Sequence, residues 1–395
     1  MNSVPAQAVA EVTACPGCGG TRFEVGWSKH GVPVMNTSLC YSPASAHAVE
    51  RGEISLARCH ECGLVFNRRF SPFAVNYGEL YEETQHYSPC FSNFEDELVR
   101  QLVACCGLRG KTICDIGCGK ADFLRRLCAS GQNRGIGIDP AICPERIPFA
   151  ERRYLQLEQR HYEPGEPLGH PDLVSLKMTL EHIAEPLNFL RGLRASLVES
   201  GCPLFIQVPN GERVLETGAF WDVYYEHCHY FSPRSMRALL ARAGFTLERL
   251  WTVFSGQYIC LIAHPVGLAQ EVAGPIPTPA FSFFSGRVAA RIQHWHALIE
   301  RHHRRGRPVF LWGGGSKAVA FLSALDAHVS IKGAVDINPH KQGTWLPGSG
   351  LPIEGPRMIR RNPDSLIIVM NPNYTNEVRR MLADVSPGPR IEALV

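Results

Sequence analysis

Short apolar runs alternate with amphipathic stretches from about residue 111 onward. The apolar runs are KTICDIG, RGIGID, PDLVSLKM and CPLFIQV, and each has the length of a buried strand. Stretches with helical spacing lie between or after them: LRRLCAS, LNFLRGLRASL and SPRSMRALLARAGF. This alternation predicts an α/β fold with a mostly parallel, doubly wound sheet, and TLERLWTVFSGQYICLIAHP predicts two adjacent strands at its end.

The pattern changes at both ends of the chain. The first 90 or so residues are rich in Cys, Gly, Pro and aromatics and carry only short extended pieces such as Ile54–Arg58, and a helical pattern begins near Phe91. Val266–Pro279 is rich in Pro and Gly, which is typical of a linker. A helical segment over about Phe281–Arg305 then leads into a second strand, glycine turn and helix, PVFLWGGGSKAVAFLSAL.

These changes predict three units. Residues 1–90 form a small loop-rich module, residues 91–265 a central doubly wound, Rossmann-like domain, and residues 266–395 a smaller Rossmann-like α/β domain. A chain of 395 residues is too long for one core, and 45% apolar residues are enough for it to fold throughout.

Net charge and the absence of targeting signals limit the kinds of partner that we expect for the protein. Forty Lys and Arg stand against 37 Asp and Glu, a balance that gives no strong attraction to polyphosphate or anionic lipid, so nucleic acid is not expected as a partner. The first residues lack the basic start and apolar stretch of a signal peptide, and no apolar run is long enough to span a membrane. A cytoplasmic protein with a small-molecule substrate is expected, and its oligomeric state stays open.

Four of the 15 cysteines form two CxxC pairs, Cys15–Cys18 and Cys59–Cys62, each followed by glycine. Glycine permits the turn that points both thiolates of a pair at one ion, and four thiolates suit tetrahedral zinc. The gap between the pairs exceeds the usual ribbon spacing of about 15–20 residues, so an insertion must loop out. Because four cysteines leave no open coordination position, a structural zinc is expected; reduced free thiols and a redox pair are the alternatives.

A glycine turn follows the first strand of the central domain. It carries Asp115, Gly117 and Gly119, and Asp139 ends the next strand. Glycines let the backbone approach a ligand closely, and a carboxylate at the end of the second strand can accept hydrogen bonds from ribose hydroxyls. An acid two residues before the first glycine suits a cationic cofactor. The set resembles class I S-adenosylmethionine-dependent methyltransferases, in which this acid lies near the amino acid part of the cofactor; dinucleotide binding and an empty fold are the alternatives.

Two further clusters carry reactive side chains. Glu181 and His182 lie just beyond a strand, where ligands of open α/β sheets bind, although such a histidine can equally cap a helix. The segment Trp221–Ser232 holds Tyr224, Glu226, His227 and more aromatics in a density that is hard to explain as core packing. A surface aromatic loop is one alternative. A metal site made by the glutamate and its two histidines is another, but neighbouring side chains in an extended segment point in alternating directions.

Taken over nearly the whole chain, these motifs resemble the zinc-containing sugar C-methyltransferase family. The resemblance includes the two CxxC pairs, the YxEHxxYFS segment and the C-terminal VDxNPxKQG, PGSGxPI and NPNY motifs. Enzymes of that family methylate carbon in nucleotide-linked ketodeoxysugars. The resemblance implies that Tyr224, Glu226 and His227, with His182, surround the ketosugar, and that an upstream aromatic reaches it. The candidates for that aromatic are Tyr81, His86 and Tyr87.

The mechanism that the resemblance implies begins with removal of a proton from the carbon beside a ketone. His227 is the expected base, because its unperturbed pKa lies near neutral pH. Tyr224 and His182 would orient the substrate and stabilise the oxyanion, and Glu226 would act through His227. Methyl transfer to oxygen or nitrogen of a small molecule is the alternative within enzymes. A non-catalytic zinc-ribbon scaffold is the alternative outside them.

The C-terminal glycine turn adds a candidate ligand site. Residues 313–317, GGGSK, follow an apolar strand and open a helix, so their amides and Lys317 could face a diphosphate, with Asp336 in the place that Asp139 has in the first turn. The turn lacks the spacing of a P-loop. Nucleotide binding and a purely structural role are left as equal alternatives for this domain.

Overall fold

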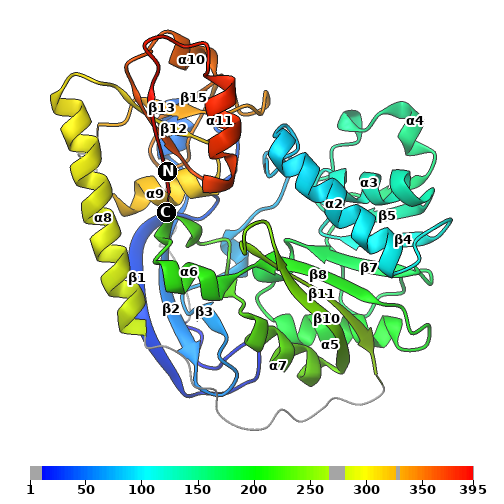
Figure 1. Ribbon diagram of the computed structural model, residues 1–395. Helices are drawn as coiled ribbons and strands as arrows, with labels where there is room; N and C mark the ends of the chain where they lie inside the picture. Colours follow the sequence, from blue (N-terminus) through cyan, green and yellow to red (C-terminus); the bar gives the residue numbers. More distant parts are fainter. Residues whose placement is uncertain (1–10, 267–280, 326–329, 395) are drawn as a thin grey trace, which may run out of the picture.

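The strands of the protein form three sheets (Figure 1). The computed structural model describes residues 11–266, 281–325 and 330–394, so most of the expected linker at Val266–Pro279 lies outside the described residues. The α/β architecture predicted from the alternating pattern is confirmed.

The N-terminal sheet has four strands in the order β1-β2-β3-β9. Their bounds are β1 (Phe23–Pro33), β2 (Arg51–Cys59), β3 (Val65–Asn67) and β9 (His229–Tyr230), and a short helix α1 (Pro43–His47) lies between β1 and β2. Strand β9 comes from a distant part of the chain and pairs antiparallel with β3, with Val65 opposite Tyr230 and Phe66 opposite His229. The N-terminal module and the segment that carries His227 therefore share one sheet.

The central sheet has seven strands in the order β10-β11-β8-β7-β4-β5-β6. Strands β4 to β8 are parallel, and β11 pairs antiparallel with β8 and β10. The strand order reverses at β4, and the carboxyl ends beside this point are where open sheets bind ligands. The strands are β4 (Thr112–Ile116), β5 (Arg134–Ile138), β6 (Leu155–Glu158), β7 (Leu173–Lys177), β8 (Leu204–Pro209), β10 (Phe245–Val253) and β11 (Tyr258–Pro265).

Helices cover the central sheet on both faces, as Figure 1 shows. They are α2 (Pro89–Cys105), α3 (Asp122–Gly131), α4 (Phe149–Arg152), α5 (Pro186–Leu197) and α7 (Pro233–Ala243). Helix α6 (Gly211–Thr217), which follows β8, packs instead against α8 (Phe281–Arg304). Local signals set their ends: Ser232 and Ser235 form a capping box that begins α7, and Gly244 ends it in a left-handed conformation.

The C-terminal unit has a six-stranded sheet in the order β14-β15-β13-β12-β16-β17, in which β14 pairs antiparallel with β15 and the other pairs are parallel. Its strands are β12 (Val309–Trp312), β13 (Gly333–Val335), β14 (Thr344–Trp345), β15 (Pro352–Glu354), β16 (Leu366–Val369) and β17 (Arg390–Ala393). Its helices are α8 (Phe281–Arg304), α9 (Ser316–Ala324), α10 (Arg357–Arg360) and α11 (Thr375–Met381). Helix α8 runs along β1 and joins this unit to the N-terminal sheet (Figure 1).

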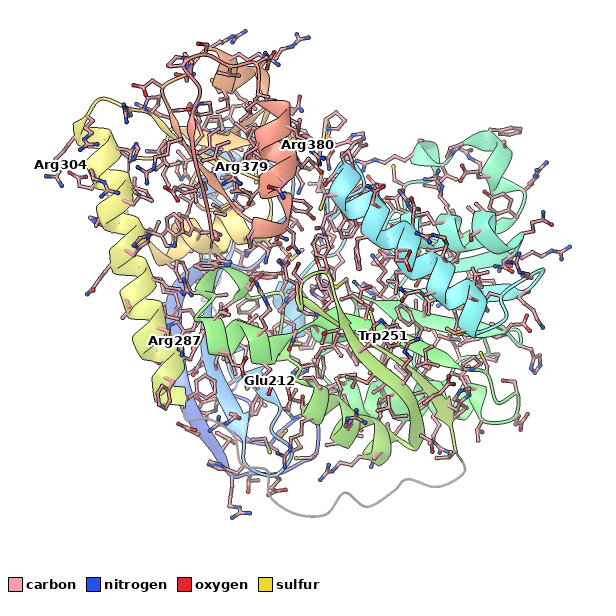
Figure 2. All side chains as sticks on the ribbon, viewed as in Figure 1. Glu212, Trp251, Arg287, Arg304, Arg379 and Arg380 are labelled. Carbon is pink, nitrogen blue, oxygen red and sulfur yellow. The ribbon has the colours of Figure 1, made fainter. Side chains whose placement is uncertain are left out.

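Side chains fill the space between these layers, whereas charged ends such as Arg304 of α8 project outward (Figure 2). One apolar cluster contains Ile54 of β2, Tyr225, Trp295 of α8 and Leu311 of β12. Its members come from all three units, so the units pack as one body. No helix among the described residues is long and apolar enough to cross a membrane.

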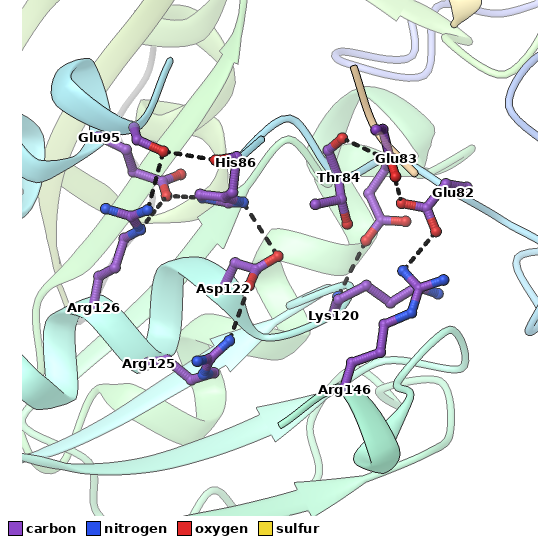
Figure 3. A network of polar contacts seen from close by, with 12 residues as sticks. Glu82, Glu83, Thr84, His86, Glu95, Lys120, Asp122, Arg125, Arg126 and Arg146 are labelled. Atoms are coloured by element: carbon purple, nitrogen blue, oxygen red, sulfur yellow. Dashed lines mark hydrogen bonds and ion pairs between the residues drawn. The ribbon is translucent and has the colours of Figure 1, made fainter. Parts of the chain in front are cut away.

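A buried carboxylate fixes α2 to the central sheet. Glu95 is completely buried, and its oxygens lie 3.0 Å from Lys177 Nζ and 3.3 Å from Arg126 Nε, with His86 also in contact (Figure 3). Burial alone would raise the pKa of Glu95, but the charge of Lys177 and the contact with His86 more than offset this and lower the pKa to about 2. A depressed carboxyl pKa stabilises the folded state above the unfolded pKa, about 4.3, and this stabilisation is lost as the pH falls toward 2.

We expect Glu95→Gln to lower the free energy of unfolding by about 3 kcal/mol at pH 7, since it leaves Lys177 buried without its charge partner. The difference from the wild type should shrink as the pH falls from about 5 to 2. Urea unfolding followed by circular dichroism measures both values. Glu97→Gln changes a half-exposed residue of the same helix and should stay within about 0.5 kcal/mol of the wild type. Equal effects of the two substitutions would contradict the role of the buried ion pair.

Candidate active site

The first glycine turn connects β4 to α3 and is closed by Asp139. Gly117 and Gly119 have φ angles of +74° and +56°, in the left-handed region that favours glycine. The Gly119 N–H donates to Asp139 Oδ2 at 2.9 Å, and the Ala141 N–H donates to Oδ1 at 2.6 Å. Asp139 therefore holds the shape of the turn, in addition to the ribose contact predicted for it.

The structure gives a second reason for both glycines. A Cβ on Gly117 would lie 2.3 Å from Thr179 Oγ1, and a Cβ on Gly119 would lie 2.2 Å from Glu83 Oε1. Close approach of a cofactor was the expected reason for these glycines. In the structure, the positive φ angles favour glycine at both positions, and Thr179 also leaves no space for a Cβ at Gly117.

Asp115 lies at the end of β4 with no exposed surface. One carboxylate oxygen accepts a hydrogen bond from Ser175, and the other has no partner among the described residues. Burial raises the pKa of Asp115 to about 7, although Ser175 and Lys177 oppose this. A half-satisfied buried carboxylate is costly, which suits a site completed by a cation.

One cavity of about 620 Å³ joins the first glycine turn to the two other clusters predicted from the sequence. Its wall includes Asp115 and Asp139, then His182, Tyr224 and His227, and on the side of the C-terminal unit Gly313, Lys317 and Asp336. Its size is within the range of small-molecule sites, about 300–1,000 Å³.

The two cavity histidines contact each other directly. The rings of His182 and His227 lie edge to face with centroids 4.7 Å apart, and the Tyr224 ring lies 4.2 Å from His227. Nδ1 of His182 lies 3.0 Å from the Glu226 main-chain oxygen and 2.9 Å from the Tyr77 hydroxyl. Since a carbonyl oxygen can only accept, Nδ1 carries the proton, and Nε2 of His182 is the basic nitrogen.

Burial keeps both histidines neutral. It lowers the pKa of His182 to about 4, and, together with the repulsion between the two rings when both are protonated, it lowers the pKa of His227 well below 6.5. The expectation that the pKa of His227 lies near neutral pH does not hold in the ligand-free protein. A neutral imidazole is nonetheless available as a proton acceptor throughout the neutral range.

Two carboxyl groups lie behind the histidines, and neither lines the cavity. Glu181 and Glu226 have no exposed surface, and burial raises the pKa of each to about 8. One donor atom each from Glu181, His182 and His227 lie within 4.8 Å of one another. The three-residue set considered from the sequence, with Glu226 and His229, is not brought together, because the His229 ring contacts the main-chain oxygen of Ile183 at 2.9 Å.

Much of the aromatic segment is packing. Tyr225 and Phe231 are almost completely buried. The Tyr225 hydroxyl donates to the Arg69 main-chain oxygen at 3.1 Å and accepts from the Ser71 N–H at 2.9 Å. The surface-loop alternative is therefore wrong, and packing accounts for more of this segment than its density suggested.

The upstream aromatic that contacts His182 is Tyr77, a residue that no sequence pattern singled out. Tyr81 packs edge to face on Tyr77 at 5.2 Å and lines the cavity. His86 and Tyr87 also line the cavity, but His86 contacts Glu95 and Asp122, and Tyr87 is 40% exposed beside His340. Tyr77 lies in an irregular stretch without periodicity, so only its contact with His182 identifies it.

The second glycine turn repeats the geometry of the first. The Gly314 N–H donates to Asp336 Oδ2 at 2.7 Å, and the Asn338 N–H donates to Oδ1 at 2.8 Å. Lys317, in the first turn of α9, forms an ion pair with Asp222 and lines the cavity. Asp336 therefore closes its own turn, as Asp139 does.

The four N-terminal thiols also come together. Sγ of Cys15 lies 3.5 Å from Sγ of Cys62, and Sγ of Cys18 lies 3.5 Å from Sγ of Cys59. All four donor atoms lie within 4.8 Å of one another, and the cysteines are free of disulfides.

Comparison with known proteins gives matches over most of the chain. Residues 91–250 match the model of a methyltransferase domain, and residues 268–388 match the model of a C-methyltransferase C-terminal domain. The C-methyltransferase NovU of Streptomyces niveus is 26% identical over 314 residues, which cover 71% of this chain and 72% of that protein. A tRNA U34 carboxymethyltransferase of Pseudoalteromonas translucida (strain TAC 125) is 32% identical over 124 residues, 28% of this chain and 33% of that one.

Two solved structures match the central part. An S-adenosylmethionine-dependent methyltransferase of Aquifex aeolicus has a TM-score of 0.36 and 20% identity, covering 45% of this chain and 94% of its own. The 1,6-didemethyltoxoflavin-N1-methyltransferase of Burkholderia thailandensis has a TM-score of 0.37 and 17% identity, and the match covers 45% of this chain and 81% of that one.

The methyltransferase domain, its glycine turn and the neighbouring cavity define an S-adenosylmethionine-dependent methyltransferase. The match of the C-terminal unit and the similarity to NovU over most of both chains assign it more narrowly. The chain belongs to the S-adenosylmethionine-dependent C-methyltransferase family.

We expect Gly117→Ala to lower the free energy of unfolding by about 3 kcal/mol, because it adds a clash with Thr179 to the strain of a positive φ. Thr179→Ala in the same chain removes the two nearest atoms and keeps a Cβ at 2.9 Å, so it should recover part of the loss and leave at least the roughly 1–2 kcal/mol of strain. Gly107 also has a positive φ, +61°, but an added Cβ there meets nothing within 4 Å. Gly107→Ala is therefore the control for strain alone. If urea unfolding shows equal losses of unfolding free energy for Gly117→Ala and Gly107→Ala, the inferred clash with Thr179 is wrong.

Proposed function

We propose that this C-methyltransferase acts on the carbon beside a ketone in a nucleotide-linked ketodeoxysugar or a similar keto substrate. The observation that carries the proposal is the single cavity that joins the first glycine turn, the pair of neutral histidines and the second glycine turn. A substrate with a ketone at one end and a phosphorylated group at the other would use both ends of this cavity.

The residues of the first turn fit the cofactor. Asp115 offers an unpartnered carboxylate oxygen, Asp139 a carboxylate at the end of β5, and the left-handed glycines an open turn between them. When bound, S-adenosylmethionine supplies an electrophilic methyl group. In the proposal, Asp115 attracts its charged amino acid part and Asp139 accepts from its ribose.

His227 is the proposed base. It is buried and neutral and it lines the cavity, so it can accept the proton from the carbon next to the ketone and leave that carbon nucleophilic. The resulting imidazolium is paired with negative charge that develops on the ketone oxygen. A well-placed base of this kind contributes typically about 10²–10⁴-fold to the rate.

Two tyrosines are the proposed donors to the ketone oxygen. The Tyr224 ring packs against His227, and the Tyr77 oxygen can accept from Nδ1 of His182, which leaves its own O–H proton free to donate. Because the Glu226 main-chain oxygen and the Tyr77 oxygen share the single Nδ1 proton of His182, we assign His182 the role of orienting Tyr77. It replaces the oxyanion contact first expected of His182.

The C-terminal unit would hold the nucleotide end of the substrate. The second glycine turn, at the start of α9, and Lys317, which is paired with Asp222, line the same cavity as the first turn. Amides at a helix start and a lysine suit a diphosphate.

The four-thiol cluster fits zinc in its donor set. Four sulfur ligands within 4.8 Å suit tetrahedral Zn²⁺ and leave no open position, so the proposed role is structural. Cys59 ends β2 and lies close to β3, the strand that pairs with β9. A metal here would stabilise the sheet that holds the segment with His227.

We expect about one zinc per chain by metal analysis of the purified protein. Cys59→Ser should lose the zinc and lower the melting temperature, because binding energy at such a site is folding energy. Cys105→Ser changes an exposed thiol outside the cluster and should change neither value. A stoichiometry near zero, or a Cys59→Ser chain that keeps its zinc, would rule out the site.

The proposed base is tested by hydrogen exchange without methyl transfer. A nucleotide-linked ketosugar incubated in D₂O with the enzyme and S-adenosylhomocysteine should take up deuterium beside its ketone, detected by mass spectrometry. His227→Asn should lose this exchange and cut turnover by about 10²–10⁴-fold, with cofactor affinity near the wild-type value.

His264→Asn is the matched control, since His264 is exposed on β11. Exchange that persists in His227→Asn but disappears in Tyr224→Phe would move the base to Tyr224. A wild-type enzyme that shows no exchange, yet methylates a hydroxyl or an amine, would replace the proposal with transfer to oxygen or nitrogen.

A further inference from the structure

The segment of residues 82–88 runs across the first glycine turn on its way to α2, as Figure 3 shows. Glu82 holds its start: its oxygens lie 2.6 Å from Arg146 Nη1 and 2.9 Å from Asn338 Nδ2. Ser88 holds its end by donating to Glu377 Oε2 at 2.8 Å. The segment is therefore fastened to both the methyltransferase domain and the C-terminal unit.

Glu83 lies between these two ends and points at the glycine turn. Its Oε1 accepts from the Lys120 N–H at 3.1 Å (Figure 3). The same oxygen lies 2.2 Å from the position that a Cβ on Gly119 would take. Its Oε2 is buried and has no hydrogen-bond partner among the described residues, and the side chain lines the cavity. The carboxylate thus reaches the turn from outside the methyltransferase fold.

Asp115 approaches the same turn from the sheet. It too is buried, lines the cavity and has one oxygen without a partner. The neighbouring ammonium groups have other partners: Lys120 Nζ donates to the Ala141 main-chain oxygen, and Lys177 Nζ pairs with Glu95. Two incompletely paired carboxylates at one glycine turn are costly unless a positively charged ligand lies between them.

The pKa values of Glu83 and Asp115 in the ligand-free protein agree with a missing positive charge between them. Burial raises the pKa of Glu83 to about 7, with the Lys120 charge opposing, and the nearby carboxylates of Asp139 and Glu82 raise it further. Burial likewise raises the pKa of Asp115 to about 7. Both carboxyls therefore lose part of their charge near neutral pH when no cation is present.

We propose that Glu83 is a cofactor-binding residue supplied by the N-terminal module, and that with Asp115 it holds the α-ammonium group of the methionyl half of S-adenosylmethionine. The cation is assigned to the cofactor, not to the substrate, because the Glu83 carboxylate lies against the first glycine turn and accepts a hydrogen bond from the Lys120 main-chain N–H. This inference rests on the proposed assignment of the first glycine turn to the cofactor.

The test is a calorimetric titration with three ligands. S-adenosylmethionine and S-adenosylhomocysteine contain the charged amino acid part, whereas 5′-methylthioadenosine keeps the nucleoside and lacks that part. Glu83→Gln should weaken the first two at least tenfold and change the affinity for 5′-methylthioadenosine less than twofold. Unchanged affinity for the first two, or an equal loss for all three, would overturn the inference.

Two controls separate binding from folding. The ligand-free melting temperature of Glu83→Gln should stay equal to or above the wild-type value, because the substitution removes an incompletely paired buried charge. A lower melting temperature with unchanged affinity would mean that Glu83 is structural. Glu82→Gln breaks the pair with Arg146, so it should lower the melting temperature while the ratio of the S-adenosylhomocysteine and 5′-methylthioadenosine affinities stays at the wild-type value.

Asp115→Asn distinguishes this inference from the proposal beneath it. If Asp115→Asn weakens the two charged ligands and Glu83→Gln does not, the glycine turn binds the cofactor and only the role of Glu83 is wrong. If neither substitution weakens them, the assignment of the turn to the cofactor fails as well.

Discussion

The position of His227 depends on the pairing of β9 with β3. Residues 224–227 lie just before β9, and the ladder from Val65 to Tyr230 holds them against the N-terminal sheet. Tyr225 bonds to the main chain at Arg69 and Ser71, and His229 bonds to the main chain at Ile183, next to His182. The cavity histidines are thus fixed by contacts between units that are far apart in sequence. A four-thiol cluster at the end of β2 stabilises the same sheet if it binds zinc, and this gives a structural metal a direct bearing on catalysis.

Burial is the second constraint on the site. His182, His227, Tyr224 and the two carboxyl groups behind them lie in a region of low dielectric, where charge is disfavoured in every group: the histidine pKa values fall and the tyrosine and carboxyl pKa values rise. A neutral base and neutral donors suit removal of a proton from carbon, since the new charges then appear close together in a site with little water. Because these side chains are buried, a change in their protonation depends on the charges that an entering substrate brings.

The sequence predicted the repetitive parts of the molecule and missed the irregular ones. Regular periodicity located β4, β5, β7, β8 and α8, and the residue pattern at strand ends located Asp115 and His182. Strand β9 has two residues and β6 has four, so neither has enough periodicity to be recognised. Tyr77 and Glu83 lie in the irregular stretch between the N-terminal sheet and α2, where long-range contacts alone decide which side chain faces the cavity. In the segment 224–231 the types of residue indicated a site, but only packing separates Tyr224 and His227 from Tyr225 and Phe231.

The two glycine turns show how one local geometry can serve opposite charges. In each, a carboxylate at the end of the next strand accepts two main-chain N–H bonds, Asp139 in the first turn and Asp336 in the second. What differs is the charge around them. The first turn has Asp115 two residues before its first glycine and Glu83 above it, whereas the second has Leu311 at the matching place and two lysines beside it, Lys341 and Lys317, of which Lys317 is paired with Asp222. Since opposite charges attract and like charges repel across a cavity of low dielectric, this division favours a cation at the first turn and an anion at the second. In the proposal, this difference places the sulfonium cofactor at the first turn and the phosphorylated group of the substrate at the second.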